Sequence, residues 1–134
     1  MTSDDVSTVQ QSWVELRRRR AALLDELTRR FEDAGSPAAA DLRAAWLLTA
    51  VEALVDLLSA PSDLAPRARE LGETWPVPGT APCLGLEGQA WLAAAGTCSP
   101  NWSQATERAW RQGWLLMCDV FAAETISPFT DRLP

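Results

Sequence analysis

The side chains best suited to metal or covalent chemistry in this 134-residue chain are three cysteines, Cys83, Cys98 and Cys118, because histidine is absent. Zinc sites use closely spaced pairs of cysteine or histidine, and the spacings of these cysteines match no such pattern. An odd number of cysteines without a secretion signal also argues against a disulfide framework. We therefore expect reduced, buried thiols, and neither a metal site nor a resident cofactor.

Acid–base catalysis requires paired titratable groups with shifted pKa values in a cleft. The carboxylates of this chain fall mainly on the outer faces of the helices predicted below, and they form no close pair among apolar residues. Asp119 is the exception, because it stands between Cys118 and Val120, and we interpret it as a surface or capping group. The sequence therefore predicts a protein that is not an enzyme.

A run of four arginines, Arg17–Arg20, is the strongest charged feature of the sequence. The net charge is nevertheless −6 and no second basic cluster accompanies the run, so we expect no nucleic-acid partner. We interpret the run as a solvated helix face on which one or two arginines pair with Glu15 or Asp25.

Length and composition predict a single globular domain, because 134 residues with 47% hydrophobic side chains can bury a core. No run of about 18 apolar residues occurs, so we expect no membrane-spanning segment. The opening residues, Met1–Asp5, are polar and acidic and lack the basic start and apolar stretch of a signal peptide. We therefore expect a cytoplasmic protein.

Apolar residues recur at helical spacing in six segments, and no segment alternates with the period of a strand. The segments begin near Val6, Leu23, Ala38, Ser62, Leu86 and Ser103. Thr2 and Asp5 resemble a capping box, and Ser103 is a candidate N-cap. We expect loose ends at residues 1–5 and 126–134, with Ser127 and Pro128 closing the last helix. The pattern predicts an all-α domain of about six helices.

The third segment, residues 38–60, is the most apolar of the six. Its predicted inner stripe comprises Leu47, Val51, Leu54 and Leu58. Its predicted outer face comprises Arg43, Glu52 and Asp56.

Several short motifs share their order and spacing with the globin family. The opening helix carries the pair Ser12-Trp13, and Leu23–Leu27 follows where bacterial globins place their second helix. Ala90–Leu92 leads through a loop to Trp102-Ser103, and Ala109-Trp110 comes seven residues later. From about Val6 to Thr125 the chain resembles a globin, which implies a globin-like fold in a single domain, residues 1–134.

The resemblance also implies that the haem site is lost. Globins place the iron-binding histidine three residues after a Leu-Gly pair, and after Leu71-Gly72 this position is Trp75. An indole N–H only donates hydrogen bonds and cannot ligate iron. The position of the oxygen-binding tyrosine of many bacterial globins is Leu24 here, and tyrosine is absent. The resemblance therefore implies a haem-free globin-like domain.

Haem-free relatives of this kind are regulatory or binding domains, and the resemblance implies two modes of action. The first is an apolar, fatty-acid-like molecule in the former haem pocket, with a predicted wall of Leu24, Leu47, Val51, Leu54, Leu71 and Trp75. The second is a protein partner, either a second copy in a homodimer or another regulatory protein. The predicted interface anchors are Trp91, Trp110, Trp114 and Phe121.

Each assignment has an alternative. Trp75 and the aromatic residues of the predicted interface can equally be core packing. A haem or tetrapyrrole with a non-histidine attachment is the second functional hypothesis, and Cys83, in the loop after Trp75, is its candidate ligand or attachment point.

Overall fold

The computed structural model describes residues 1–34, 39–74, 76 and 84–130, with residues 61, 84–86 and 121–130 described by their backbone alone. These residues form six α-helices and a short 3₁₀ turn, and they contain no strand. The helices are α1 (Ser3–Arg17), α2 (Arg20–Asp33), α3 (Ala40–Leu57), α4 (Leu64–Glu73), α5 (Leu84–Cys98) and α6 (Gln104–Thr130), and the turn is η1 (Pro61–Asp63). The predicted all-α class with about six helices is confirmed.

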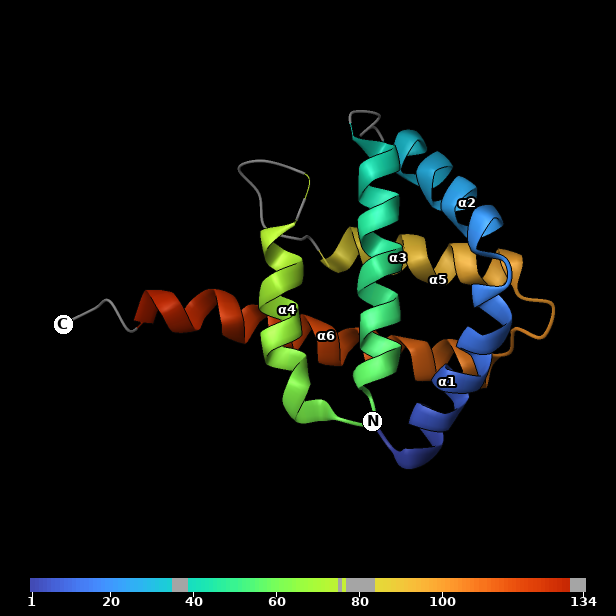
Figure 1. Ribbon diagram of the computed structural model, residues 1–134. Helices are drawn as coiled ribbons and strands as arrows, with labels where there is room; N and C mark the ends of the chain where they lie inside the picture. The colour runs from blue at the N-terminus through green and yellow to red at the C-terminus, as the bar shows by residue number, and fades with distance from the viewer. Residues whose placement is uncertain (35–38, 75, 77–83, 131–134) are drawn as a thin grey trace.

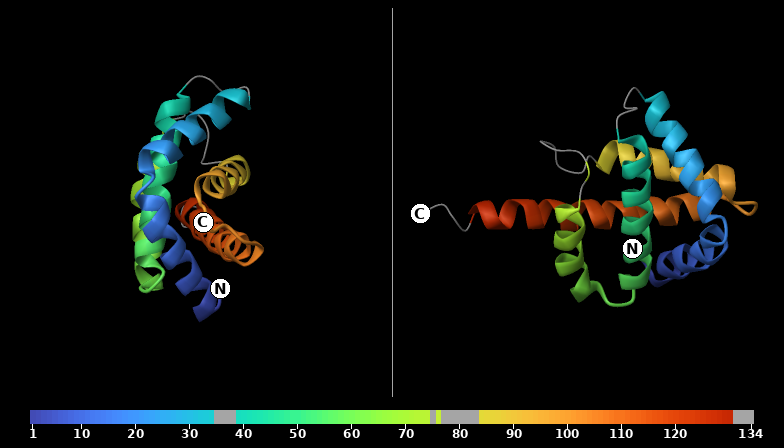
Figure 2. Two further views of the ribbon diagram at one scale, coloured as in Figure 1. Left: turned by 90° about the vertical axis from the view of Figure 1, so that its right-hand side faces the viewer. Right: turned by 45° about the horizontal axis from the view of Figure 1, so that its top comes forward.

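The helices form two crossed layers (Figure 1). Helices α3 and α4 lie side by side on one side of the molecule, and α5 and α6 lie side by side on the other and cross them steeply (Figure 2). Helices α1 and α2 close one end, where α1 contacts α6 and α2 contacts both α3 and α5. None of the described helices has the length and apolarity needed to cross a membrane.

Polar residues at the two predicted caps start their helices as expected. Thr2 accepts a hydrogen bond from the Asp5 amide at 3.1 Å, and the Asp5 carboxylate accepts one from the Thr2 amide at 3.0 Å. This reciprocal pair satisfies two amides that a helix start leaves open. Helix α1 therefore begins at Ser3, and the expectation of a loose N-terminus was wrong. Ser103 likewise accepts from the Thr106 amide at 3.1 Å and precedes α6.

The last helix is longer than predicted. Helix α6 continues through Ser127 and Pro128 to Thr130, and its final turns extend beyond α4 (Figure 1). The expected end at residue 126 was wrong, because a proline removes one backbone donor without forbidding the turns around it. Helix α5 runs to Cys98, so the loop before Trp102 is short.

Helix α3 is buried on most of its circumference. It starts at Ala40, two residues later than predicted, after Ala39 in a left-handed conformation with φ of 61°. The predicted inner stripe is confirmed, because Leu47, Val51, Leu54 and Leu58 are all buried. Arg43, predicted to face out, is also buried, because α2 and α5 provide partners for its guanidinium, as described below.

Candidate functional site

The residues predicted to line an apolar ligand pocket lie in a filled interior. Leu47, Val51, Leu54 and Leu71 are at most 4% exposed, and Leu24 is half-buried. Only Leu54 and Leu71 share a crevice, which lies between α3, α4 and α6 and has a volume of about 10 Å³. That volume is no larger than the space one water molecule needs. The described residues therefore leave no room for an apolar ligand there, and Trp75 lies outside the described residues.

Trp46, which the sequence analysis did not assign to any site, joins α3 to the end of α4. The buried indole of Trp46 donates a hydrogen bond from Nε1 to the Leu71 carbonyl at 2.8 Å. The Thr74 hydroxyl donates to the same carbonyl at 2.9 Å. This carbonyl lies four residues before Trp75 in the sequence, and the buried indole packs between α3 and the C-terminal end of α4.

A buried ion pair ties α3 to α5. Arg43 donates from Nη2 to Oε1 of Glu87, and the side chains are 8% and 0% exposed. The Arg43 guanidinium also lies 4.5 Å from the centre of the Phe31 ring on α2, in a cation–π arrangement. Oε2 of Glu87 has no hydrogen-bond partner among the described residues. Helices α2, α3 and α5 thus meet at one charged pair in an apolar setting.

Sequence reasoning missed this pair. Arg43 lies on a helix face that the apolar pattern assigned to solvent, and its partner is 44 residues away. The available signal was Glu87, a lone carboxylate one helical turn before the core residue Trp91 and therefore on the same face of an apolar helix.

Three of the predicted interface anchors are core residues. Trp91 and Trp110 are fully buried and Trp114 is 6% exposed. The rings of Trp91 and Trp110 meet edge to face with centroids 5.1 Å apart, and Trp13 lies 6.2 Å from Trp91. The interface assignment of these three is corrected to core packing, because α1, α5 and α6 bury them within one chain. The Phe121 side chain lies outside the described residues.

The cysteines offer no described site. Cys83 lies outside the described residues, whereas Cys98 and Cys118 are half-buried free thiols on α5 and α6. Burial raises the pKa of both thiols, which disfavours the thiolate that a metal would need. No group of three or more histidine, cysteine or acidic side chains within the described part of the chain is placed to hold a metal ion.

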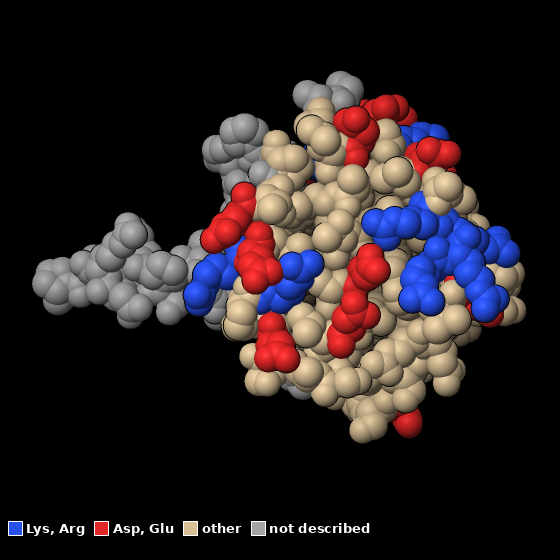
Figure 3. All heavy atoms as spheres, viewed as in Figure 1, with Lys and Arg blue, Asp and Glu red and all other residues tan. Residues whose placement is uncertain are grey.

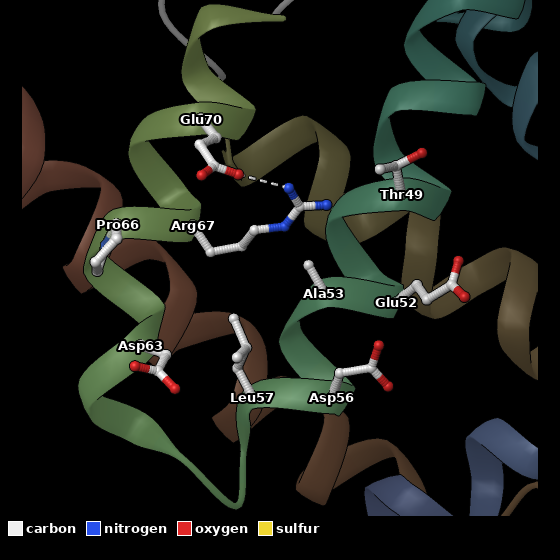
Figure 4. Close-up of a pocket in the computed structure, with 9 residues that line it drawn as sticks. All are labelled: Thr49, Glu52, Ala53, Asp56, Leu57, Asp63, Pro66, Arg67 and Glu70. Carbon is white, nitrogen blue, oxygen red and sulfur yellow. Dashed lines mark hydrogen bonds and ion pairs between the residues drawn. The ribbon is translucent and has the colours of Figure 1, made fainter.

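A groove on the outer surface between α3 and α4 has a volume of about 570 Å³ (Figure 4). Ala53, Leu57 and Pro66 give it an apolar lining, and Thr49 stands at its α3 side. Its charged residues are Glu52, Asp56, Asp63, Arg67 and Glu70. The single arginine is already engaged, since Arg67 pairs with Glu70 at 2.7 Å. The groove is therefore open and lined by both apolar and acidic residues.

No family model, curated protein or solved structure matches this chain. The groove and the closed interior are therefore interpreted from their own chemistry. An open groove with apolar and acidic lining residues suits a positively charged protein surface better than it suits an apolar small molecule, because such a molecule would leave the carboxylates facing an uncharged ligand.

An arginine-rich corner lies beside the groove on the same face (Figure 3). All four residues of Arg17–Arg20 are exposed, at the junction where α1 ends and α2 begins. Arg20 pairs with Glu52 of α3 at 3.4 Å, so the partner is not Glu15 or Asp25 as predicted. The α1–α2 bend explains the difference, because it turns Arg20 toward α3 instead of along its own helix.

Proposed function

We propose that this chain is a haem-free globin-like domain that works by binding another protein through the face formed by α3 and α4. The observation that carries the proposal is the contrast between two hollows: about 10 Å³ in the apolar interior and about 570 Å³ in the open acidic groove. Pockets for small ligands usually measure about 300–1,000 Å³. The interior crevice falls far below this range, and the groove is too open and charged for an apolar molecule.

The packing supports the globin-like part of the proposal. Steeply crossed helices in two layers are typical of globin-like folds and differ from the near-parallel helices of a four-helix bundle. Two motifs that carry the resemblance also meet in space, because the Trp110 indole donates a hydrogen bond to the Ser12 hydroxyl at 2.9 Å. The Trp46–Leu71 hydrogen bond joins α3 to the end of α4, four residues before the position that the resemblance assigns to the iron ligand.

A fatty-acid-like ligand is less well supported than a protein partner, because the described part of the interior is filled by side chains. A haem or tetrapyrrole attached through Cys83 stays an alternative prediction. Binding through a surface requires no catalytic group, and we propose a role without enzymatic activity. We also propose that the protein acts in the cytoplasm.

Haemin titration followed by absorption spectroscopy tests the haem-free part of the proposal. We expect no Soret band in the purified protein and no saturable uptake of haemin, because the described interior is closed between α3 and α4. The variant Cys83→Ser is the control for the alternative. Tight one-to-one uptake that Cys83→Ser abolishes would replace the proposal with thiolate ligation. Displacement of a fluorescent fatty-acid analogue, measured in parallel, would instead show an interior ligand site.

A further inference from the structure

The outer face of the α3–α4 layer carries unneutralised charges of both signs. Arg17, Arg18 and Arg19 form no ion pair among the described residues, and neither do Asp56 and Asp63 in the groove. Four carboxylates line the groove against one arginine, which is itself paired with Glu70. The face therefore presents a cationic corner and a groove in which Asp56 and Asp63 stay without an ion pair, and within one chain the Arg20–Glu52 pair joins the two regions.

The outward strip of α3 lies between the two charged regions; it is uncharged at Leu42, Ala45 and Thr49 but acidic further along, where Glu52 and Asp56 follow Thr49 three and seven residues later. The exposed residues Leu42, Ala45 and Thr49 recur at three- and four-residue spacing along this helix, so they share one outward side. The arginine corner lies on one side of α3 and the groove lies on the other (Figures 3 and 4). Leu42 is 56% exposed and is one of the few large apolar side chains left open to solvent. The uncharged part of the strip, around Leu42, is thus suited to helix–helix contact, and Glu52 and Asp56 extend the acidic side of the face onto α3.

We propose that this face binds a second copy of the same chain about a two-fold axis that runs along α3. Rotation about such an axis places the arginine corner of each copy over the groove of the other, while the two α3 strips meet at the axis. The contact is isologous and closes at two copies. The inference rests on the proposed function, for which it names the partner, and it moves the predicted homodimer from the buried tryptophans to the charged face.

Charge complementarity is the reason for choosing a second copy over a different protein. A partner for the groove must present several cations, and Arg17–Arg20 beside the α3 strip provides them. Complementary charges fix register and speed encounter. Arg67 would face the incoming arginines, but its pairing with Glu70 at 2.7 Å offsets that repulsion.

The salt dependence of self-association is the first readout. Analytical ultracentrifugation of the full chain should show dimers whose dissociation constant rises at least about tenfold between about 0.1 M and about 1 M sodium chloride. Over that range the screening length falls from about 10 Å to about 3 Å. A monomer at every salt concentration, or a dimer indifferent to salt, would overturn the inference.

Charge reversal in two complementary variants is the sharper test. The corner variant carries Arg18→Glu and Arg19→Glu, and the groove variant carries Asp56→Arg and Asp63→Arg. Each should be monomeric alone, since both contacts of the symmetric pair become repulsive. Mixing them should restore a heterodimer, because every contact then joins opposite charges. A chain with all four substitutions should form a homodimer again, which shows that the single-patch variants did not simply misfold.

A matched control changes the same amount of charge in the other layer. Arg108→Glu and Arg111→Glu lie on exposed positions of α6, and this variant should dimerise as the parent chain does. Dimers that persist in both single-patch variants, or a mixture that stays monomeric, would overturn the two-fold arrangement. Neither result would contradict the proposed function, because haemin titration tests the closed interior independently. The partner would then be a different protein.

Discussion

The tryptophan core buries large aromatic side chains, whereas the α3–α4 face leaves charged side chains exposed. In the core, Trp13, Trp91 and Trp110 come from three helices and pack against one another, with ring centroids 5.1 and 6.2 Å apart. All three side chains are buried. On the α3–α4 face, carboxylates and arginines stay open around a groove of about 570 Å³. The comparison teaches that aromatic content alone did not mark an exposed surface, whereas unneutralised charge marks the face that we propose for binding.

An arginine–glutamate ion pair occurs both in the interior and on the α3–α4 face. Arg43 and Glu87 are almost completely buried, whereas Arg20 and Glu52 are each about half exposed at a separation of 3.4 Å. Water stabilises each exposed ion when its partner is removed, so exposed pairs contribute little, about 0–1 kcal/mol. A buried ion has no such substitute, and removing one partner leaves an uncompensated charge.

The largest expected effect comes from breaking the buried pair. Glu87→Ala should lower the free energy of unfolding by about 3–5 kcal/mol, because the Arg43 guanidinium would stay buried without its carboxylate. Urea unfolding followed by circular dichroism measures the change. Glu52→Ala is the matched control, and it should cost less than about 1 kcal/mol.

Replacing both members of the buried pair separates the charge effect from the loss of packing. Arg43→Met combined with Glu87→Leu should recover most of the stability lost in Glu87→Ala, since no ion is then left buried. If Glu87→Ala alone cost no more than Glu52→Ala, the pair would be hydrated in solution, and the contrast between the two regions would be lost.

The helices of this chain were largely predictable because local signals specify them. The apolar spacing located all six, and the Thr2 and Ser103 side chains marked two of their starts. The ends were less predictable. Helix α6 continues past Pro128, and Ala39 adopts a left-handed conformation before α3. The surrounding backbone determines both features, and residue type does not.

The candidate site was much less predictable because it depends on contacts between distant segments. The groove forms where the outward faces of α3 and α4 lie side by side, and each of those faces alone is typical of ordinary solvated helix surface. The Arg43–Glu87 pair and the Trp46–Leu71 hydrogen bond likewise join residues far apart in the sequence. The tryptophans were ambiguous, because the same spacing serves a core or an interface, and only the packing of α1 decides between them.

Two glycines give an intermediate test of the same contrast. A Cβ at Gly88 on α5 would stand 2.5 Å from Nε1 of Trp114, whereas a Cβ at Gly72 on α4 would meet nothing within 4 Å. Gly88→Ala should therefore destabilise the protein by about 1–3 kcal/mol through overpacking. Gly72→Ala should stabilise it by up to about 1 kcal/mol, because alanine favours a helix over glycine.

Thermal and urea unfolding of the two glycine variants measures these opposite signs directly. The pair is well matched, because both positions receive the same methyl group within a helix. Equal effects at both positions would mean that Trp114 moves aside without cost, and that the α5–α6 contact is as adaptable as the open α4 surface.

The smallest expected effect concerns Glu26, an acidic residue whose partners are on its own helix. Hydrogen bonding from Arg29 at 2.5 Å, with Arg30 at 2.9 Å, lowers the pKa of Glu26 from its ordinary value of 4.5. A carboxylate with a lowered folded-state pKa stabilises the fold above the unfolded pKa, and that contribution is lost as the pH falls through the folded value. The free energy of unfolding should therefore decline below a pH of about 4.5, with no more than about 1 kcal/mol due to this surface cluster.

Urea unfolding between about pH 6 and pH 3 should show a shallower decline in Glu26→Gln than in the parent chain. Identical pH profiles would show that the Glu26 cluster contributes nothing to the pH dependence of stability.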